Sequence, residues 1–166
     1  ISSQIAESIF ALGFTTQFLK RITGRQSPFR AMEMENPVSG GDWHPFPNPA
    51  KYQKKVSNFD AFPSGHMATA MATLTVLLSN YPDNKYIKPV GYSLLGVLGF
   101  AMINNGVHWI SDYPLGLAIG YTCGKIVSAR GHLAIPRLSD KKGATSVLLP
   151  SYLGYGNVGL SYRATF

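Results

Sequence analysis

Three glycines spaced four residues apart constrain the fold of this chain more than any other feature. Gly116, Gly120 and Gly124 lie in an apolar run over residues 110–129. Residues four apart share one face of an α-helix, so this run would present a stripe free of side chains to its neighbour. Such a stripe lets a second helix approach closely. The spacing therefore predicts a helix with one face that a neighbouring helix can approach closely.

Three more segments are expected to be helical, over residues 4–22, 64–80 and 88–104. The chain is 45% hydrophobic and only 14% charged, which suits buried helices. A membrane-spanning helix needs about 20 apolar residues, and polar residues, Pro or Gly interrupt these runs sooner. A soluble or peripheral bundle and an integral-membrane bundle both remain open. We predict an all-α fold with a helical domain over residues 1–143.

Two stretches do not fit the helical pattern. Residues 36–62 are rich in Pro and Gly but also carry aromatic side chains, which predicts an ordered lid or rim loop rather than a disordered segment. Residues 144–166 form a separate tail. Apolar and polar residues alternate from Val158 to Phe166, behind a turn-like segment over 154–157. This period predicts a C-terminal β-hairpin or extended tail.

The charge of the chain suits an anionic partner. The net charge is +7, and the basic residues are clustered. Such clusters attract phosphate esters or anionic lipid headgroups, and no nucleic-acid-binding motif accompanies them. The one cysteine, Cys123, excludes an intrachain disulfide and a zinc site built on cysteines.

The segment Pro63-Ser64-Gly65-His66 comes directly before a predicted helix. Ser64 is a good N-cap, and the free N–H groups of the first turn form an anion site. Gly65 lets an oxyanion approach the backbone, and His66 can reach a bound phosphate. Taken alone, an ordinary capped helix start explains the segment as well.

A second imidazole occurs in the segment His108-Trp109-Ile110-Ser111-Asp112. If this segment is helical, His108 and Asp112 lie on one face and can touch. A carboxylate on one ring nitrogen fixes the tautomer and makes the other nitrogen a better nucleophile. Lys20, close before the Gly24-Arg25 turn, can point a cation into a cleft. A surface pair and a solvated basic helix end are the simpler alternatives.

In combination these residues resemble the type-2 phosphatidic acid phosphatase and vanadium haloperoxidase superfamily. The pattern of that family is Lys, six residues, Arg-Pro; then Pro-Ser-Gly-His; then Ser-Arg, five residues, His, three residues, Asp. The match extends from Lys20 through 63–66 to His108 and Asp112.

The resemblance implies an all-α bundle and a phosphatase that needs no metal or other cofactor. His108 would form a phosphohistidine, Asp112 would orient it, and His66 would protonate the leaving group. Lys20 and the backbone at Ser64 and Gly65 would bind the phosphate. The implied substrate is a phosphorylated lipid, an isoprenoid pyrophosphate or a small phosphate ester. The implied location is the bacterial cell envelope, periplasmic or membrane-associated, and a homo-oligomer is compatible with it.

Two positions depart from the pattern. The first arginine of the family falls at Ser27, and the third-motif Ser-Arg falls at Ala101-Met102. Both arginines would bind phosphate through charge-assisted hydrogen bonds. Arg25 is our candidate substitute for the first, and Asn104 or Asn105 could donate hydrogen bonds near the second.

These departures leave two alternatives to a phosphatase. One is a non-enzymatic or very slow envelope-associated helical module that retains the fold. The other is a vanadium haloperoxidase, for which the chain is short and which needs the same missing arginines.

Overall fold

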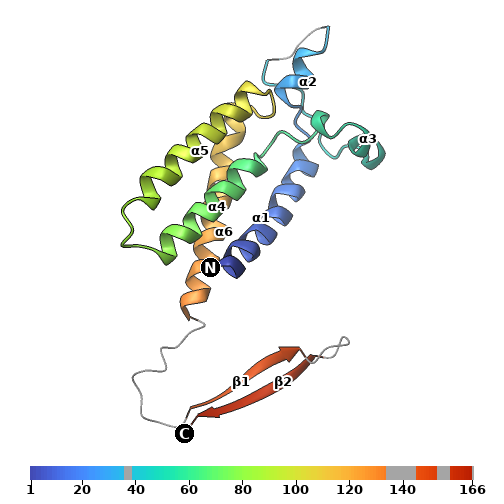
Figure 1. The fold of residues 1–166 in the computed structure, drawn as a ribbon. Coiled ribbons are helices and arrows are strands. Elements are labelled where there is room, and N and C mark those ends of the chain that lie inside the picture. The colour runs from blue at the N-terminus through green and yellow to red at the C-terminus, as the bar shows by residue number, and fades with distance from the viewer. Residues whose placement is uncertain (36–38, 134–144, 153–157, 166) are drawn as a thin grey trace. The chain divides into compact units, whose positions relative to one another are not determined.

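The computed structural model describes residues 1–35, 39–133, 145–152 and 158–165, with the side chains of 1–35 and 39–130. The chain divides into two compact units, Ile1–Ala134 and Ile135–Phe166. The first unit is helical (Figure 1). Its elements in chain order are α1 (Ser2–Thr23), α2 (Pro28–Met32), α3 (Pro49–Lys54), the 3-10 turn η1 (Val56–Asn58), α4 (Gly65–Asn80), α5 (Ile87–Asn104), the 3-10 turn η2 (Ile110–Asp112) and α6 (Tyr113–Leu133).

Helix α4 is the central element of this unit. It packs along α6 and also contacts α1 and α5. The predicted glycine stripe makes the α4–α6 approach possible. A Cβ at Gly116 would lie 2.5 Å from the carbonyl oxygen of Ser64, and one at Gly120 would lie 2.2 Å from that of Ala68. At Gly124 it would lie 2.9 Å from the carbonyl oxygen of Ala72. The predicted helical bundle and the close approach of a helix at the glycines are therefore confirmed.

A small apolar core fills the other side of α4. Met67 and Met71 pack with Leu95 of α5 and Tyr113 of α6. The Tyr113 hydroxyl donates a hydrogen bond of 2.6 Å to the carbonyl oxygen of Gly99, which satisfies the buried polar atom. Burial and the neighbouring Asp112 raise the pKa of Tyr113. The core thus ties α5 and α6 to the first turns of α4.

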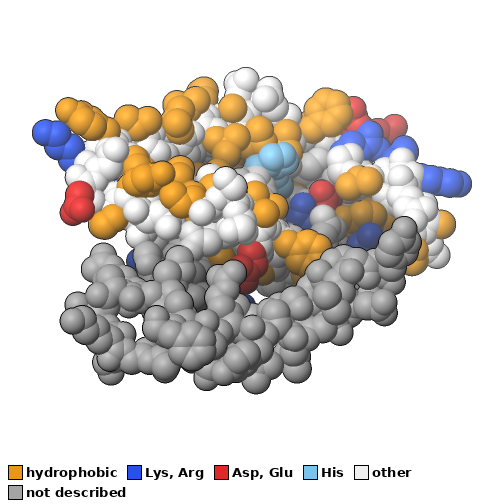
Figure 2. Space-filling model, turned by 60° about the horizontal axis from the view of Figure 1, so that its bottom comes forward, with side chains coloured by type: hydrophobic (Ala, Val, Ile, Leu, Met, Phe, Trp, Pro, Cys, Tyr) orange, Lys and Arg blue, Asp and Glu red, His pale blue; other side chains and the backbone are white. Residues whose placement is uncertain are grey.

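Much apolar surface remains exposed on the helical unit (Figure 2). Phe10, Phe14 and Phe18 on α1 are 85%, 77% and 58% exposed. Helix α5 is long and apolar enough to cross a membrane by length and composition alone, and only 6% of it is buried. Soluble monomers rarely expose apolar patches of this extent.

The predicted loop over residues 36–62 contains two short helical pieces, α3 and η1, while 36–38 lie outside the described residues. The loop is fixed to the end of α1 through Arg25, whose backbone bridges both Trp43 and Asp60. Gly24 makes the turn into this bridge: it ends α1 with a φ of 56°, and a Cβ there would lie 1.8 Å from the His44 carbonyl oxygen.

The second unit contains the antiparallel strands β1 (Thr145–Tyr152) and β2 (Val158–Thr165). Their register pairs Leu148 with Tyr162 and Tyr152 with Val158. The predicted C-terminal hairpin is therefore present, and its predicted turn at 154–157 lies outside the described residues.

Candidate active site

The start of α4 places His66 at one end of the bundle. Ser64 caps the helix as predicted, because its Oγ accepts a hydrogen bond of 3.4 Å from the Met67 N–H. The Ser64 N–H donates to the carbonyl oxygen of Asp112 at 3.0 Å. This backbone bond joins the two sequence motifs directly. Gly65 and His66 occupy the first turn, where N–H groups have no partner within the helix.

The segment of His108 is not the helix that the His-Asp spacing suggested. His108 lies in a loop between α5 and η2, and its N–H points to the Met102 carbonyl oxygen at 3.5 Å. Asp112 ends η2, and its Oδ2 accepts a bond of 2.7 Å from the Trp109 N–H. The pair still comes together: His108 Nδ1 and Asp112 Oδ2 are 3.6 Å apart. The loop that Asp112 closes thus places the imidazole and the carboxylate side by side, as one face of a helix would.

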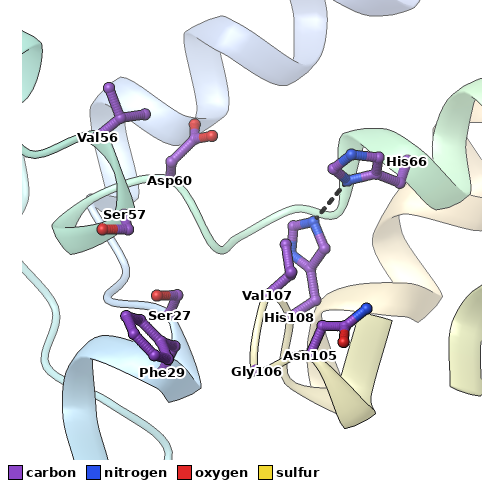
Figure 3. A pocket seen from close by; sticks show the side chains of 10 residues that line it. All are labelled: Ser27, Phe29, Val56, Ser57, Asp60, His66, Asn105, Gly106, Val107 and His108. Carbon is purple, nitrogen blue, oxygen red and sulfur yellow. Dashed lines mark hydrogen bonds between the residues drawn. The ribbon is translucent and has the colours of Figure 1, made fainter. Parts of the chain in front are cut away.

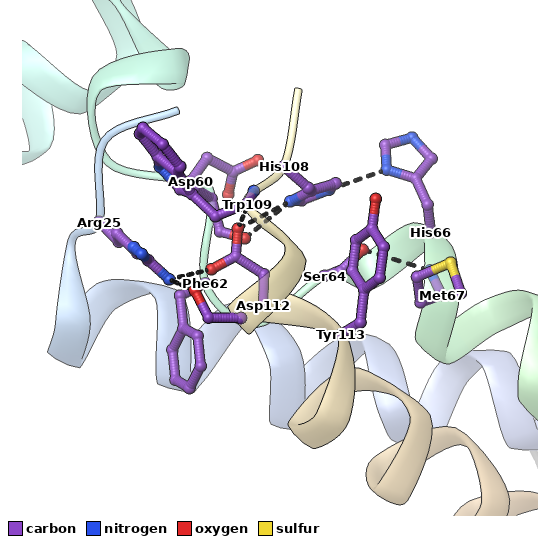
Figure 4. Close-up of polar contacts among 12 residues, drawn as sticks. Arg25, Asp60, Phe62, Ser64, His66, Met67, His108, Trp109, Asp112 and Tyr113 are labelled. Atoms are coloured by element: carbon purple, nitrogen blue, oxygen red, sulfur yellow. Dashed lines mark hydrogen bonds and ion pairs between the residues drawn. The ribbon is translucent and has the colours of Figure 1, made fainter. Parts of the chain in front are cut away.

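The two histidines face each other (Figure 4). His108 Nε2 lies 3.2 Å from His66 Nδ1. On its other side, His108 Nδ1 lies 2.8 Å from the carbonyl oxygen of Ala61. A carbonyl only accepts hydrogen bonds, so His108 Nδ1 carries the proton and Nε2 of the neutral ring has a free lone pair. The Ala61 carbonyl therefore fixes the tautomer, with the Asp112 carboxylate behind it.

Arg25, the predicted substitute for the first arginine of the family, forms an ion pair with Asp112. Its Nη1 binds Asp112 Oδ1 at 2.5 Å and Ser111 Oγ at 2.8 Å, and its Nε and Nη2 donate to the Gly40 carbonyl oxygen. The Asp112 side chain is fully buried and that of Arg25 is 7% exposed. The guanidinium also stacks against Trp43 and Trp109. The guanidinium is thus committed to Asp112, and its predicted contact with phosphate stays a prediction.

Lys20 does reach the start of α4. Its Nζ is 3.8 Å from the position that a Cβ on Gly65 would take. The same Nζ forms an ion pair of 3.0 Å with Asp60 Oδ1. Asp60 also accepts a hydrogen bond of 2.8 Å from the Tyr52 hydroxyl. Burial and this bond raise the pKa of Tyr52 to about 12. Asp60 was not predicted as a site residue, although it lies only three residues before Pro63, where the Pro-Ser-Gly-His segment begins.

Two hollows meet at His66. The first, of about 340 Å³, extends to His108 and is bordered by Ser27, Asp60 and Asn105 (Figure 3). The Ser27 Oγ is buried and has no hydrogen-bond partner among the described residues. The second, of about 480 Å³, runs from Lys20 and Gly65 along α1 and α4. Its surface is mostly apolar, although Thr16, Gln17 and Thr69 also line it. Ser27 and Asn105, at or near the positions of the missing arginines, therefore both line the hollow beside His108.

The surroundings of His66 favour the neutral form of its imidazole. Its pKa is lowered, first by burial and then by the nearby His108 and Lys20, while Asp60 acts in the opposite direction. Among residues 1–35 and 39–130, no group of three or more His, Cys, Asp or Glu side chains could hold a metal ion. The arrangement can offer a nucleophilic nitrogen, a second imidazole for proton transfer and a lysine beside a helix N-terminus.

Part of this chain is similar to a curated phosphatase. The Lipid A 1-phosphatase of Porphyromonas gingivalis is 34% identical over 68 residues, which cover 40% of this chain and 15% of that protein. The chain therefore spans a small part of the relative that it matches. No solved structure matches it. The profile of the PAP2 superfamily matches residues 3–134, which include every predicted site residue. The chain belongs to the PAP2 superfamily.

Proposed function

We propose that this protein is a phosphatase that hydrolyses phosphate esters through a phosphohistidine intermediate on His108. The observation that carries the proposal is the facing pair of imidazoles, with 3.2 Å between His108 Nε2 and His66 Nδ1. The proton on His108 Nδ1 is directed to the Ala61 carbonyl, so the nitrogen toward His66 is the nucleophile. Membership of the PAP2 superfamily supports the same assignment.

The reaction would proceed in two steps. His108 Nε2 attacks phosphorus, the bond from phosphorus to the ester oxygen breaks, and protonated His66 gives its proton to the leaving alkoxide. Neutral His66 then takes a proton from water, whose oxygen attacks phosphorus. The bond from phosphorus to His108 Nε2 breaks, which releases inorganic phosphate and returns His108 to its free form. Lys20 and the first-turn N–H groups at Gly65 and His66 bind the phosphate oxygens. The N–H of Ser64, which the sequence also predicted as a phosphate donor, already bonds the Asp112 carbonyl oxygen. Asp112, held by Arg25, stabilises the imidazolium form of His108.

We propose a lipid phosphate as the substrate class. The apolar hollow that begins at Lys20 and His66 offers a place for a hydrocarbon chain beside the phosphate site. The exposed apolar faces of α1 and α5 favour a protein associated with the membrane of the cell envelope. The Lipid A 1-phosphatase of Porphyromonas gingivalis supports this substrate class.

The first experiment is phosphate release from p-nitrophenyl phosphate, phosphatidate and an isoprenoid pyrophosphate. We expect turnover by the natural protein and its loss in His108→Ala. His44→Ala is the matched control, because His44 is exposed and lies outside both hollows. The intermediate is sought by mass spectrometry after an alkaline quench, as added phosphate on the peptide of His108. Turnover that survives in His108→Ala would refute the mechanism.

One observation favours a second candidate, a very slow or non-enzymatic helical module. Where the family pattern has an arginine, the hollow beside His108 is bordered by Ser27, whose hydroxyl carries no charge. Losing one such transition-state contact can raise the barrier by about 3 kcal/mol. Folded protein that releases no phosphate from any of the three substrates would support this candidate.

A further inference from the structure

Lys20, the lysine of the candidate site, already forms an ion pair with the carboxylate of Asp60. Lys20 Nζ and Asp60 Oδ1 are 3.0 Å apart, and the two side chains are 8% and 28% exposed. Asp60 also borders the hollow that contains His108 and His66. The carboxylate therefore contacts the group that would bind a phosphate oxygen, and it borders the same hollow as the imidazole that would attack phosphorus.

A carboxylate and a phosphate group are both anions that accept hydrogen bonds from the same ammonium group. Lys20 has three N–H donors, and Asp60 already takes one in the phosphate-free protein. A phosphate bound at Lys20 would also be repelled by the nearby carboxylate, and this repulsion is stronger in a partly buried site than in water. Because of this repulsion, phosphate binding weakens the Lys20–Asp60 pair even though Lys20 has donors left.

Asp60 keeps a second donor when that pair opens. The Tyr52 hydroxyl donates to it at 2.8 Å, and a pKa of about 12 keeps this hydroxyl protonated at every working pH. The guanidinium of Arg21 lies 3.8 Å from the centre of the Tyr52 ring and brings positive charge to the same side. The Asp60 carboxylate therefore stays hydrogen-bonded on the side of α3 when Lys20 turns to a phosphate.

We propose that Asp60 competes with the substrate phosphate for Lys20 and thereby sets how tightly the site binds a phosphate group on its own. This inference rests on the proposed function in taking Lys20 as the phosphate-binding lysine. Free phosphate, the product, then binds weakly and leaves easily. A substrate gains its remaining affinity from the rest of the ester, for which the apolar hollow along α1 and α4 provides the surface.

The test is the dissociation constant of inorganic phosphate, measured by isothermal titration calorimetry at pH 7 and low salt. Asp60→Asn removes the charge and keeps an oxygen for the Tyr52 hydroxyl. Because a hydrogen bond between charged groups is replaced by a weaker one, we expect phosphate to bind about tenfold more tightly. Asp83→Asn makes the same change in net charge in an exposed position beyond the far end of α4, and it should leave the constant unchanged.

Tyr52→Phe gives a second, opposite readout. Without the tyrosine hydroxyl, Asp60 depends on Lys20 alone, so phosphate should bind several-fold more weakly. Unchanged or weaker binding in Asp60→Asn would overturn the proposal and make Asp60 a support for Lys20. Absence of phosphate binding in both the natural protein and Asp60→Asn would overturn it too. Neither result depends on turnover, so failure of the proposed hydrolysis is seen separately in the His108→Ala assay.

Discussion

Replacing Arg25 by methionine tests which partner this arginine serves. The substitution keeps most of the length and the apolar contacts with Trp43 and Trp109, but it removes the guanidinium donors to Asp112, Ser111 and Gly40. Asp112 is fully buried and would keep a carboxylate without a cation. Removing one partner of a buried ion pair typically costs about 3–5 kcal/mol. For a chain of this size, that lowers the melting temperature by about 10 °C.

The assay is denaturant unfolding of Arg25→Met, Asp112→Asn and the double variant, combined in a double-mutant cycle. The double variant removes both charges, so it should be less destabilised than the sum of the single variants. We expect a coupling free energy of about 2 kcal/mol. Arg30→Met is the matched control. Arg30 pairs with Glu33 at the surface, where an ion pair contributes less than about 1 kcal/mol.

A different result would restore the role predicted from the sequence. If Arg25 binds phosphate, Arg25→Met should leave the free energy of unfolding within about 1 kcal/mol of the natural value, as for an exposed pair. It should then raise KM for p-nitrophenyl phosphate, and the cycle with Asp112→Asn should show no coupling. That combination would refute the structural argument.

Three further changes have defined outcomes. Gly120→Ala should lower the free energy of unfolding by about 1–3 kcal/mol, because its Cβ would lie 2.2 Å from the Ala68 carbonyl oxygen. In the control Gly96→Ala the new Cβ has no atom within 4 Å, so this substitution should not destabilise α5. The pKa of His66 is lowered, and its protonated form is the proposed acid. We therefore expect kcat/KM to fall as pH rises through a value below about 6.5. A fall that begins only above that pH would contradict the assignment of His66 as the acid. Ser27→Arg, which restores the family arginine in the hollow beside His108, should raise kcat/KM about tenfold, while Ser27→Gln should not.

The bundle could be predicted from the sequence because its strongest signals are local. The four-residue glycine spacing required a close helix neighbour, and the structure supplies α4 opposite all three glycines. The short helices α2 and α3 were not foreseen, because each begins at a proline and extends over only five or six residues, too few to show a helical period. Their positions depend on contacts with distant parts of the chain, which no local pattern records.

The candidate site was predictable only in part. The motifs identified His66, His108 and Asp112, and the structure brings these together. The condition that His108 and Asp112 share one helix is not met, since bonds to Met102 and Trp109 hold His108 in a loop. The acceptor for His108 is a backbone carbonyl 47 residues earlier, and any residue type provides a carbonyl. The residue type at position 61 therefore gives no sign of this contact in the sequence.

The bond from the Ser64 N–H to the Asp112 carbonyl, together with Gly116 against Ser64, has a consequence for motion in the site. Both contacts are made by backbone, so the His66 turn and the loop of His108 should move as one body. Lys20 comes from α1, which is joined to that body by side-chain packing, by the Asp60 ion pair and by the backbone bridge from Arg25 to Asp60 at its end. Thermal displacement of α1 would therefore change the distance from cation to phosphate and leave the distance between the two imidazoles unchanged.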